Sequence, residues 1–300
     1  MAYTATANAF LNTLFNKFIL QEVRTKTYEN PLAGFKKETL PMGYDAEFIH
    51  VNPVTLADYA QPAAPAYTDP FKTAIPVTFG EYLSVNINKI AEATIYEDTL
   101  LDAFTSYEKF DVMVQSIINS LYSGNNIWEY NEIRKLAASN VTAKKVKATE
   151  ISPVTDLATG QAAIIALLDT VNALTYPTSD YNYAKNGNTP AISFCDVENQ
   201  RIMMTYAMWD RLLTYNYSSA FHDELIRLKP RVVLVDKIDD AGKIAAIIMD
   251  EGYLQFRDRK FSVESIINPA DLSINYWLRR RVLSGCVGFA NAHALITVAL

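Results

Sequence analysis

The chain has 300 residues, half of them hydrophobic and a fifth charged, a composition typical of a folded protein with one large or two modest domains. Its net charge of −6 argues against broad non-specific binding to nucleic acid. No stretch approaches the roughly 18 apolar residues of a membrane span, and the first residues lack the features of a signal peptide. We therefore expect a protein that is made and used in the cytoplasm and has no membrane partner.

Two residue types bear on the kind of protein this is. Tyrosine is abundant, with 18 residues, and it suits surfaces that become interfaces because an apolar ring carries a polar hydroxyl. The two cysteines, Cys195 and Cys286, lack a metal-ligand spacing and are too few for a disulfide framework. We expect both to be small buried hydrophobic side chains.

The N-terminal part predicts a short helix followed by an extended arm. Apolar residues in 8–20 recur at helical spacing and form one face: Phe10, Leu11, Leu14, Phe15, Phe18 and Ile19. Only Lys17 would stand on the polar face, so this face is expected to pack on protein and not on a membrane surface. Prolines and glycines in 25–43 exclude a continuous helix and favour an extended arm.

Residues 46–89 predict a long two-stranded hairpin. The alternating pattern in 46–52 and the run 74–89 each favour a strand, while Pro62, Pro65 and Pro70 exclude helix and central strand between them. An isolated hairpin is only marginally stable in water. We therefore expect this one to rest on another chain.

The stretch 105–140 predicts an unusually long helix. It opens with a capping box formed by Thr105 and Glu108, and apolar residues follow at helical spacing on one face. Unbroken, it would be a rod of roughly 50 Å. Gly124 costs roughly 1 kcal/mol relative to alanine inside a helix, so we expect a bend or break near 123–126.

The remainder predicts a mixed α/β layer and long C-terminal strands. A second helix is expected over 157–174 and a loop over 176–190, followed by a strand at 201–206, a helix at 207–215 and buried strands at 231–235 and 243–249. Long strands are expected over 261–267 and 272–297, split at Asn268–Pro269. The C-terminal run is expected to pair with the distant stretch AKKVKATEI, residues 143–151.

No sequence motif for catalysis, nucleotide binding or metal binding is present. His50, His222 and His293 stand alone and far apart, which favours satisfied polar residues over a cluster. Asp236, Asp239 and Asp240, and likewise Asp250 and Glu251, could hold a cation or act as acid and base. Nothing near them supplies a nucleophile or a phosphate loop, so we expect solvated carboxylates and assign no catalytic residue, cofactor or metal.

The run Arg279–Arg280–Arg281 is the most informative charged feature. On a strand, Arg279 and Arg281 share one face and Arg280 takes the other. Burying all three within one subunit would be costly unless they are paired. Three solvated arginines on an exposed edge remain an equal alternative. If they have partners, we expect carboxylates of neighbouring subunits first and DNA phosphate second.

The order of these elements resembles the major capsid proteins of tailed bacteriophages, which have the Hong Kong-97 fold. The stretch YDAEFIHVNP resembles the strand that opens their extended loop, and IYEDTLLDAFTSYEKFDVMVQSIINSLYSGNNIWEY resembles their short helix and long spine helix. YNYAKNGN, RIMMTYAMWDRLL, PRVVLVDK and NPADLSINYWLRRRVLSGCVGFANA resemble segments of capsid proteins from small phages of Gram-positive hosts. The arginine run is a departure, because fewer charges are expected there.

The resemblance implies an α+β fold with five segments. These are an N-terminal arm (1–43), an extended β-hairpin loop (44–92), the spine helix with the first peripheral-domain strand (93–155), an axial domain (156–249) and the remaining peripheral-domain strands (250–300). Contacts between subunits are expected from the arm, the loop and the arginine strand: Phe10, Phe15, Pro62, Pro65, Tyr67, Arg279, Arg280 and Arg281.

The resemblance also implies a biological role. The expected protein is a non-enzymatic capsid subunit that forms hexamers and pentamers of an icosahedral shell around double-stranded DNA, without sequence specificity. It would be assembled in the host cytoplasm and end in the virion. A separate scaffolding protein, a portal and decoration proteins are the expected partners. Two other interpretations are an encapsulin-type nanocompartment shell, with a protein cargo, and a cytoplasmic hydrolase that uses scattered carboxylates.

Overall fold

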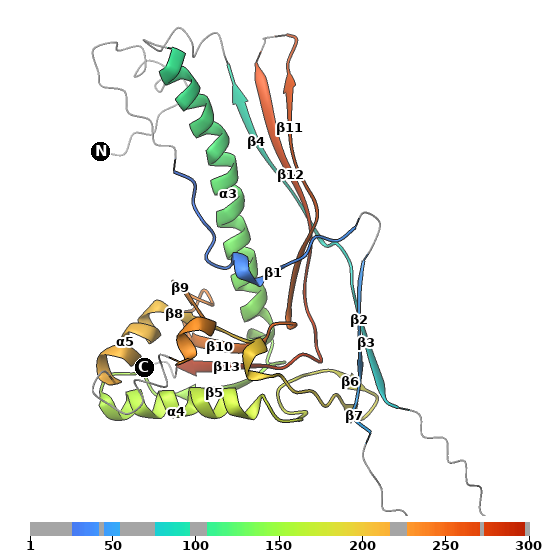
Figure 1. The fold of residues 1–300 in the computed structure, drawn as a ribbon, viewed down its shortest axis with the longest axis vertical. Coiled ribbons are helices and arrows are strands. Elements are labelled where there is room, and N and C mark those ends of the chain that lie inside the picture. The colour runs from blue at the N-terminus through green and yellow to red at the C-terminus, as the bar shows by residue number, and fades with distance from the viewer. Residues whose placement is uncertain are drawn as a thin grey trace, which may run out of the picture. The chain divides into compact units, whose positions relative to one another are not determined.

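The computed structural model describes residues 26–41, 45–54, 76–96, 107–216, 227–270 and 273–297 (Figure 1). The chain divides into two compact units. Unit 1 consists of Met1–Tyr44, Val85–Ile133 and Phe256–Leu283, and unit 2 of Asp45–Ser84, Arg134–Gln255 and Ser284–Leu300. No helix within the described ranges is long and apolar enough to cross a membrane.

The described part of unit 1 contains a four-stranded sheet and most of the long helix. Its sheet has the order β1-β11-β12-β4. The elements are the 3₁₀ turn Ala33–Phe35, β1 (Lys36–Lys37), β4 (Ile87–Ile95), α3 (Tyr107–Thr142), β11 (Leu254–Ile267) and β12 (Ile274–Cys286); the last three continue into unit 2. Figure 1 shows α3 running alongside the long strands of this unit.

Strands β12 and β4 pair antiparallel over nine residues, from Ile274 opposite Ile95 to Val282 opposite Ile87. Because side chains alternate between the faces of a strand, Leu278 and Arg280 are buried while Arg279 and Arg281 are exposed. The predicted division of the three arginines between two faces is confirmed.

The predicted long helix is confirmed, and the predicted break in it is wrong. Helix α3 runs without interruption through Gly124. The neighbouring polar residues hold the N-terminal arm: the backbone N–H of Tyr28 donates to Ser123 Oγ at 3.1 Å, and Asn126 Nδ2 donates to the Tyr28 carbonyl at 2.7 Å. The Ser-Gly-Asn-Asn stretch, which predicts a break by local propensity, is therefore a docking site for the arm. The capping residue Thr105 lies outside the described residues.

Unit 2 is built on a five-stranded sheet with the order β5-β13-β10-β8-β9. Its strands are β5 (Lys147–Ile151), β8 (Gln200–Thr205), β9 (Val232–Val235), β10 (Ile244–Asp250) and β13 (Ala292–Thr297). Helices α4 (Leu157–Ala173) and α5 (Tyr206–Asn216) contribute Ile164, Leu167, Trp209 and Leu212 to one hydrophobic core with the sheet. The expected pairing between the C-terminal run and AKKVKATEI is confirmed as the parallel pair β13–β5, although β5 begins only at Lys147.

Helix α4 begins at a capping box that the sequence pattern did not predict. The Asp156 carboxylate accepts from the backbone N–H of Thr159 at 2.8 Å, and Thr159 Oγ1 accepts from the backbone N–H of Asp156 at 3.1 Å. Hydrogen bonds from the backbone N–H and the hydroxyl of Thr159 to the Asp156 carboxylate hold the pKa of this carboxyl below its usual value. The pattern was missed because threonine, not glutamate, stands at the third helical position.

The expected single strand over 272–297 is two strands that belong to different sheets. Strand β12 ends at Cys286 and β13 begins at Ala292, with β12 beside β4 and β13 between β5 and β10. The intervening chain passes close to Tyr183, where Gly288 leaves room: a Cβ added at Gly288 would lie 2.8 Å from Tyr183 Cε2. Strand β11 is also longer than expected, because it begins at Leu254 and not at 261.

Candidate functional site: the arginine strand and the hairpin

The structure places three of the eight predicted contact residues. Phe10, Phe15, Pro62, Pro65 and Tyr67 lie outside the described residues. Arg279, Arg280 and Arg281 lie on β12 in unit 1. These arginines are therefore where the prediction can be compared with geometry.

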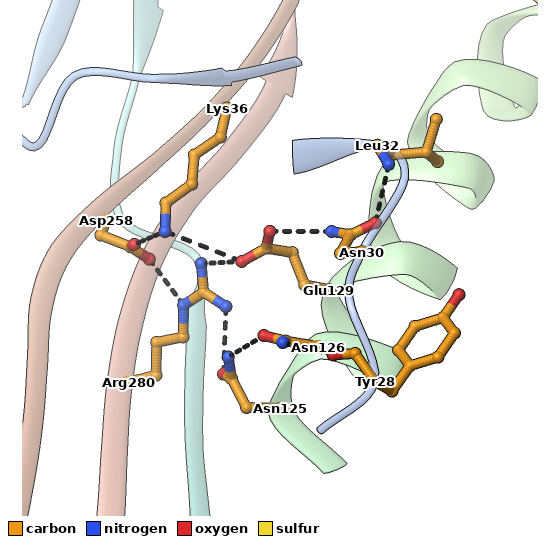
Figure 2. Close-up of polar contacts among 9 residues, drawn as sticks. All are labelled: Tyr28, Asn30, Leu32, Lys36, Asn125, Asn126, Glu129, Asp258 and Arg280. Atoms are coloured by element: carbon orange, nitrogen blue, oxygen red, sulfur yellow. Dashed lines mark hydrogen bonds and ion pairs between the residues drawn. The ribbon is translucent and has the colours of Figure 1, made fainter. Parts of the chain in front are cut away.

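Arg280 is almost fully buried, with 1% of its surface exposed, and its guanidinium is paired on several sides (Figure 2). Nε donates to Asp258 Oδ1 at 2.6 Å, and Nη2 forms an ion pair with Glu129 Oε2. Nη1 donates to Asn125 Oδ1 at 3.0 Å. Both carboxylates are themselves buried, so the cluster joins strand β12 to β11 and to helix α3 by charge-assisted hydrogen bonds.

The N-terminal arm completes this cluster. Lys36 Nζ lies 2.5 Å from Asp258 Oδ2 and 3.7 Å from Glu129 Oε2, so two cations face two carboxylates. Asn30 Nδ2 donates to the other Glu129 oxygen at 2.8 Å, and Asn30 Oδ1 accepts from the Leu32 backbone N–H (Figure 2). The balance of charge compensates for the cost of burying these groups.

Aromatic rings surround the Arg280 guanidinium. Its Cζ lies 5.3 Å from the ring centre of Trp128, 5.5 Å from that of Phe256 and 5.9 Å from that of Phe261. Rings at this distance attract a cation through their quadrupoles and shield the ion pairs from water. We call Arg280, Asp258, Glu129 and Lys36 the buried cluster.

These contacts correct the expectation for Arg280. Carboxylates of neighbouring subunits were expected to be its first partners, but its carboxylates belong to its own chain. The sequence could not reveal this, because Glu129 and Asp258 are far from Arg280 along the chain. Arg279 and Arg281 are exposed on the opposite face. For these two residues, a contact with a neighbouring subunit stays a prediction.

The hairpin is confirmed as β2 (Ala46–Val51) paired antiparallel with β3 (Thr78–Leu83) in unit 2. The described part of the hairpin, which we call its base, is held by polar contacts to residues 190–192. Asn52 Nδ2 donates to the Pro190 carbonyl at 3.0 Å, while Asn52 Oδ1 accepts from the Ile192 backbone N–H at 2.8 Å. The His50 ring is stacked on Phe289, with 5.3 Å between the ring centres.

Strand β3 adds further contacts at the same base. The Glu81 carboxylate accepts from the Gly288 backbone N–H, and Asn186 Nδ2 donates to the Thr78 carbonyl at 3.0 Å. The expectation that the hairpin rests on another chain is therefore wrong for its base, which rests on its own chain. The Pro-rich tip lies outside the described residues.

The outer face of the hairpin carries exposed apolar side chains. Ile49 is 67% exposed, Tyr82 is 65% exposed, and Val51 is also exposed. All three lie on the face opposite buried Phe79. Exposed β-branched and aromatic side chains on one strand face mark a surface suited to contact with protein.

Unit 2 buries a group of weakly acidic side chains beside α3. Asn140 Nδ2 donates at 3.1 Å to the hydroxyl groups of both Tyr183 and Tyr253. Burial raises the pKa of both tyrosines well above the usual range and that of the Cys286 thiol to about 12. Cys195 and Cys286 are free and buried, as expected, and burial also raises the pKa of the Cys195 thiol.

His293 is buried on β13, where Nε2 lies 2.9 Å from Thr149 Oγ1. Burial, with a smaller contribution from Lys147, lowers its pKa to about 4. The unfolded chain, with a histidine pKa near 6.5, therefore binds more protons between pH 6.5 and 4. We expect acidification through this window to reduce the free energy of unfolding by about 1–3 kcal/mol on account of His293.

Urea denaturation at a series of pH values measures this effect. The loss should be smaller in His293→Gln than in the parent chain, because the variant has no group that titrates at this position. Identical pH profiles for the two proteins would contradict the assignment.

Two other histidines were considered from the sequence. His50 has a different partner, the Ile192 carbonyl, and His222 lies outside the described residues.

The acidic groups considered from the sequence have structural partners. Asp239 accepts from the Ile244 backbone N–H at 2.9 Å, Asp240 pairs with Arg134 at 3.0 Å, and Glu251 pairs with Arg201 at 3.2 Å. The hydrogen bond from Arg134 and its charge hold the pKa of the Asp240 carboxyl below its usual value. Within the described ranges, no three His, Cys, Asp or Glu side chains are grouped so that they could hold a metal ion.

Comparison with known proteins gives a consistent result. The family model for Phi29-like phage major capsid proteins matches residues 1–296. The chain is 26% identical over 298 residues to the major capsid protein of Bacillus phage GA-1, covering 98% of this chain and 61% of the relative. It is 28% identical over 298 residues to that of Bacillus phage B103, covering 97% and 64%. The chain thus spans about six tenths of the length of these curated relatives.

A solved structure shares the fold. The capsid structure of Staphylococcus phage Andhra contains a chain that matches with a TM-score of 0.72 at 12% identity, over 94% of this chain and 88% of that chain. At this identity the likeness shows the fold alone, which is the α+β fold of phage capsid subunits. It confirms the fold class that the resemblance implied.

Proposed function

The chain belongs to the family of Phi29-like phage major capsid proteins, and on this premise we propose that it is the shell subunit of a phage head. It assembles with copies of itself into hexamers and pentamers, which close an icosahedral shell around double-stranded DNA. The observation that carries the proposal is the family match across residues 1–296. The same match favours this role over a nanocompartment shell or a hydrolase.

The segments of the chain have separate roles in this shell. Residues 156–249 form the main part of the axial domain; in support, α4, α5, β8, β9 and β10 share one hydrophobic core, to which β5 and β13 of the same sheet add Ile151 and Leu295. The spine helix and the strands of residues 93–155 and 250–300 form the peripheral domain, except for β5 and β13, which belong to the five-stranded sheet of unit 2. The extended loop, 44–92, lies over a neighbouring subunit, and the exposed apolar outer face of its hairpin supports this role. The N-terminal arm, 1–43, lies over another.

The remaining partners follow from the same role. DNA is packed without sequence specificity, which the net charge of −6 supports, since an acidic subunit does not hold DNA tightly. Assembly takes place in the host cytoplasm with a scaffolding protein, a portal and decoration proteins. The subunit is structural and has no catalytic role.

Size-exclusion chromatography and negative-stain microscopy of the purified protein test the proposal directly. Shells, tubes or capsomers in the early-eluting fractions are the expected result, with and without a scaffolding protein from the same phage. A monomer that remains monomeric under both conditions would refute the proposal.

Deletion of residues 57–71 tests the lattice role of the hairpin. We expect shell closure to fail while the subunit stays folded, because the contacts that hold the hairpin base come from Asn52, Thr78 and Glu81. Circular dichroism and thermal melting report folding, and electron microscopy reports closure. A variant with a Gly/Ser segment of equal length is the control for loop length. Normal shells from the deletion variant would contradict this role.

A further inference from the structure

We propose that the exposed cationic side chains Lys89, Lys260, Arg279 and Arg281 of unit 1 form a site that binds carboxylates of a second copy of this chain. We call these four residues the cationic site. The inference rests on the proposed function and deepens it, since it names the chemistry of one contact between subunits.

The four residues of the cationic site line a cavity at the surface of unit 1. This cavity of about 450 Å³ is also lined by Asn88 and Ile90. Cross-strand pairing places Arg279 directly opposite Ile90 and Arg281 directly opposite Asn88. The side chain of Arg279 is 50% exposed and that of Lys260 is 40% exposed, so both can reach a partner.

The charge of this site is not balanced within the chain. Glu264 lies 3.9 Å from Arg279 and 3.6 Å from Lys260. Among the described residues, Arg281 and Lys89 have no ion-pair partner. Arg280, on the other face of the same strand, is paired with two carboxylates. Arg279 and Arg281 therefore carry excess positive charge on the exposed face of β12, whereas Lys89 stands opposite Arg280 in the strand pairing.

A protein partner fits this site better than nucleic acid does. Ile90 is 52% exposed in the middle of the cations, and covering it stabilises a complex only if the partner has apolar groups beside its charges. Two neighbouring arginines can each bind a carboxylate through two hydrogen bonds. A second copy supplies such groups, since the chain has 33 acidic residues against 27 basic ones.

Zero-length cross-linking identifies the partner atoms. Assembled particles made from equal parts of ¹⁴N- and ¹⁵N-labelled protein are treated with a carbodiimide, which joins a lysine amine to a carboxylate in contact with it. The variant R279K/R281K adds two lysines to Lys89 and Lys260. We expect cross-linked peptides of mixed isotope that join these lysines to Asp or Glu. Cross-links to Glu264 of the same chain alone would overturn the proposal.

Charge reversal gives an independent measurement. R279E/R281E should reduce particle yield at low salt at least tenfold, while R279K/R281K and the charge-matched control K229E/K243E stay near the parent yield. Thermal melting confirms that each variant is folded. Unchanged yield in R279E/R281E overturns the proposal, and so does normal assembly with loss of DNA retention, which would assign the site to nucleic acid. Failure of the parent chain to assemble would instead count against the proposed function.

Discussion

Replacing Arg280 by methionine is expected to lower the free energy of unfolding by about 3–5 kcal/mol, because it leaves two buried carboxylates without their main cation. Of the two cations of the buried cluster, Asp258 and Glu129 would keep Lys36, whose side chain is one-third exposed and lies 3.7 Å from Glu129. Methionine has a similar volume and is apolar, so the packing against Trp128 and Phe256 is largely retained. The loss of stability in Arg280→Met therefore measures the effect of the unpaired carboxylates more than the effect of the changed side-chain volume.

The next residue on the strand provides the control. Arg281→Met removes the same side chain from the exposed face, and its effect on stability should stay within about 0.5 kcal/mol. Chemical denaturation followed by tryptophan fluorescence measures both variants, since Trp128 lies beside the guanidinium. Equal effects of the two substitutions would contradict the role of the buried cluster.

Removal of the carboxylates should partly rescue the first variant. In R280M/E129Q/D258N the unpaired carboxylate charges are gone, and we expect more than about 1 kcal/mol of the lost stability to return. The amide oxygen introduced at position 129 can still accept from Asn30. A triple variant that is less stable than Arg280→Met would show that packing, and not unpaired charge, explains the loss.

The spacing of apolar residues along the chain predicted helices and strands correctly where neighbouring residues alone determine them. The spacing of apolar residues predicted α3 and α4, and alternation placed Arg280 on the face opposite Arg279 and Arg281. The pairing of β13 with β5 also followed from two strand-like runs. These features depend on the periodicity of helix and strand, which a single sequence contains.

The features that were missed depend on contacts between distant residues. Gly124 has a high cost in an isolated helix, but the arm and Asn125 make contacts there that favour the unbroken helix. The partners of Arg280 come from two other segments of the chain, α3 and β11. The tip of the extended loop, with Pro62 and Tyr67, lies outside the described residues, and its role stays a prediction.

A substitution in the turn between β12 and β13 is also expected to reduce stability strongly. Gly288→Ala should lower the free energy of unfolding by about 1–3 kcal/mol, since the new Cβ would lie 2.8 Å from Tyr183 Cε2 and 3.3 Å from Glu81 Oε2. The tyrosine ring cannot move aside freely, because its hydroxyl accepts from Asn140 and its backbone N–H donates to the Gly288 carbonyl at 3.0 Å. The substitution therefore strains the loop and the hairpin at once.

Alanine substitutions at two other glycines are controls. They show whether the loss of stability in Gly288→Ala is specific to this position. At Gly285 the added Cβ would meet the ends of the flexible Leu83 side chain at 2.9 Å, so a smaller loss is expected. At Gly124 it would meet no atom within 4 Å, and alanine should raise stability by about 1 kcal/mol through its higher helix propensity.

Urea denaturation ranks the three variants, and hydrogen exchange of the β2 and β3 amides reports whether the hairpin base is loosened. Because Glu81 links β3 to Gly288, faster exchange in β3 is expected for Gly288→Ala and not for Gly124→Ala. A loss of stability in Gly288→Ala with unchanged exchange in the hairpin would show that the turn and the hairpin are independent. The expected result instead makes this glycine the point where the C-terminal strands fix the base of the loop that reaches a neighbouring subunit in the proposed shell.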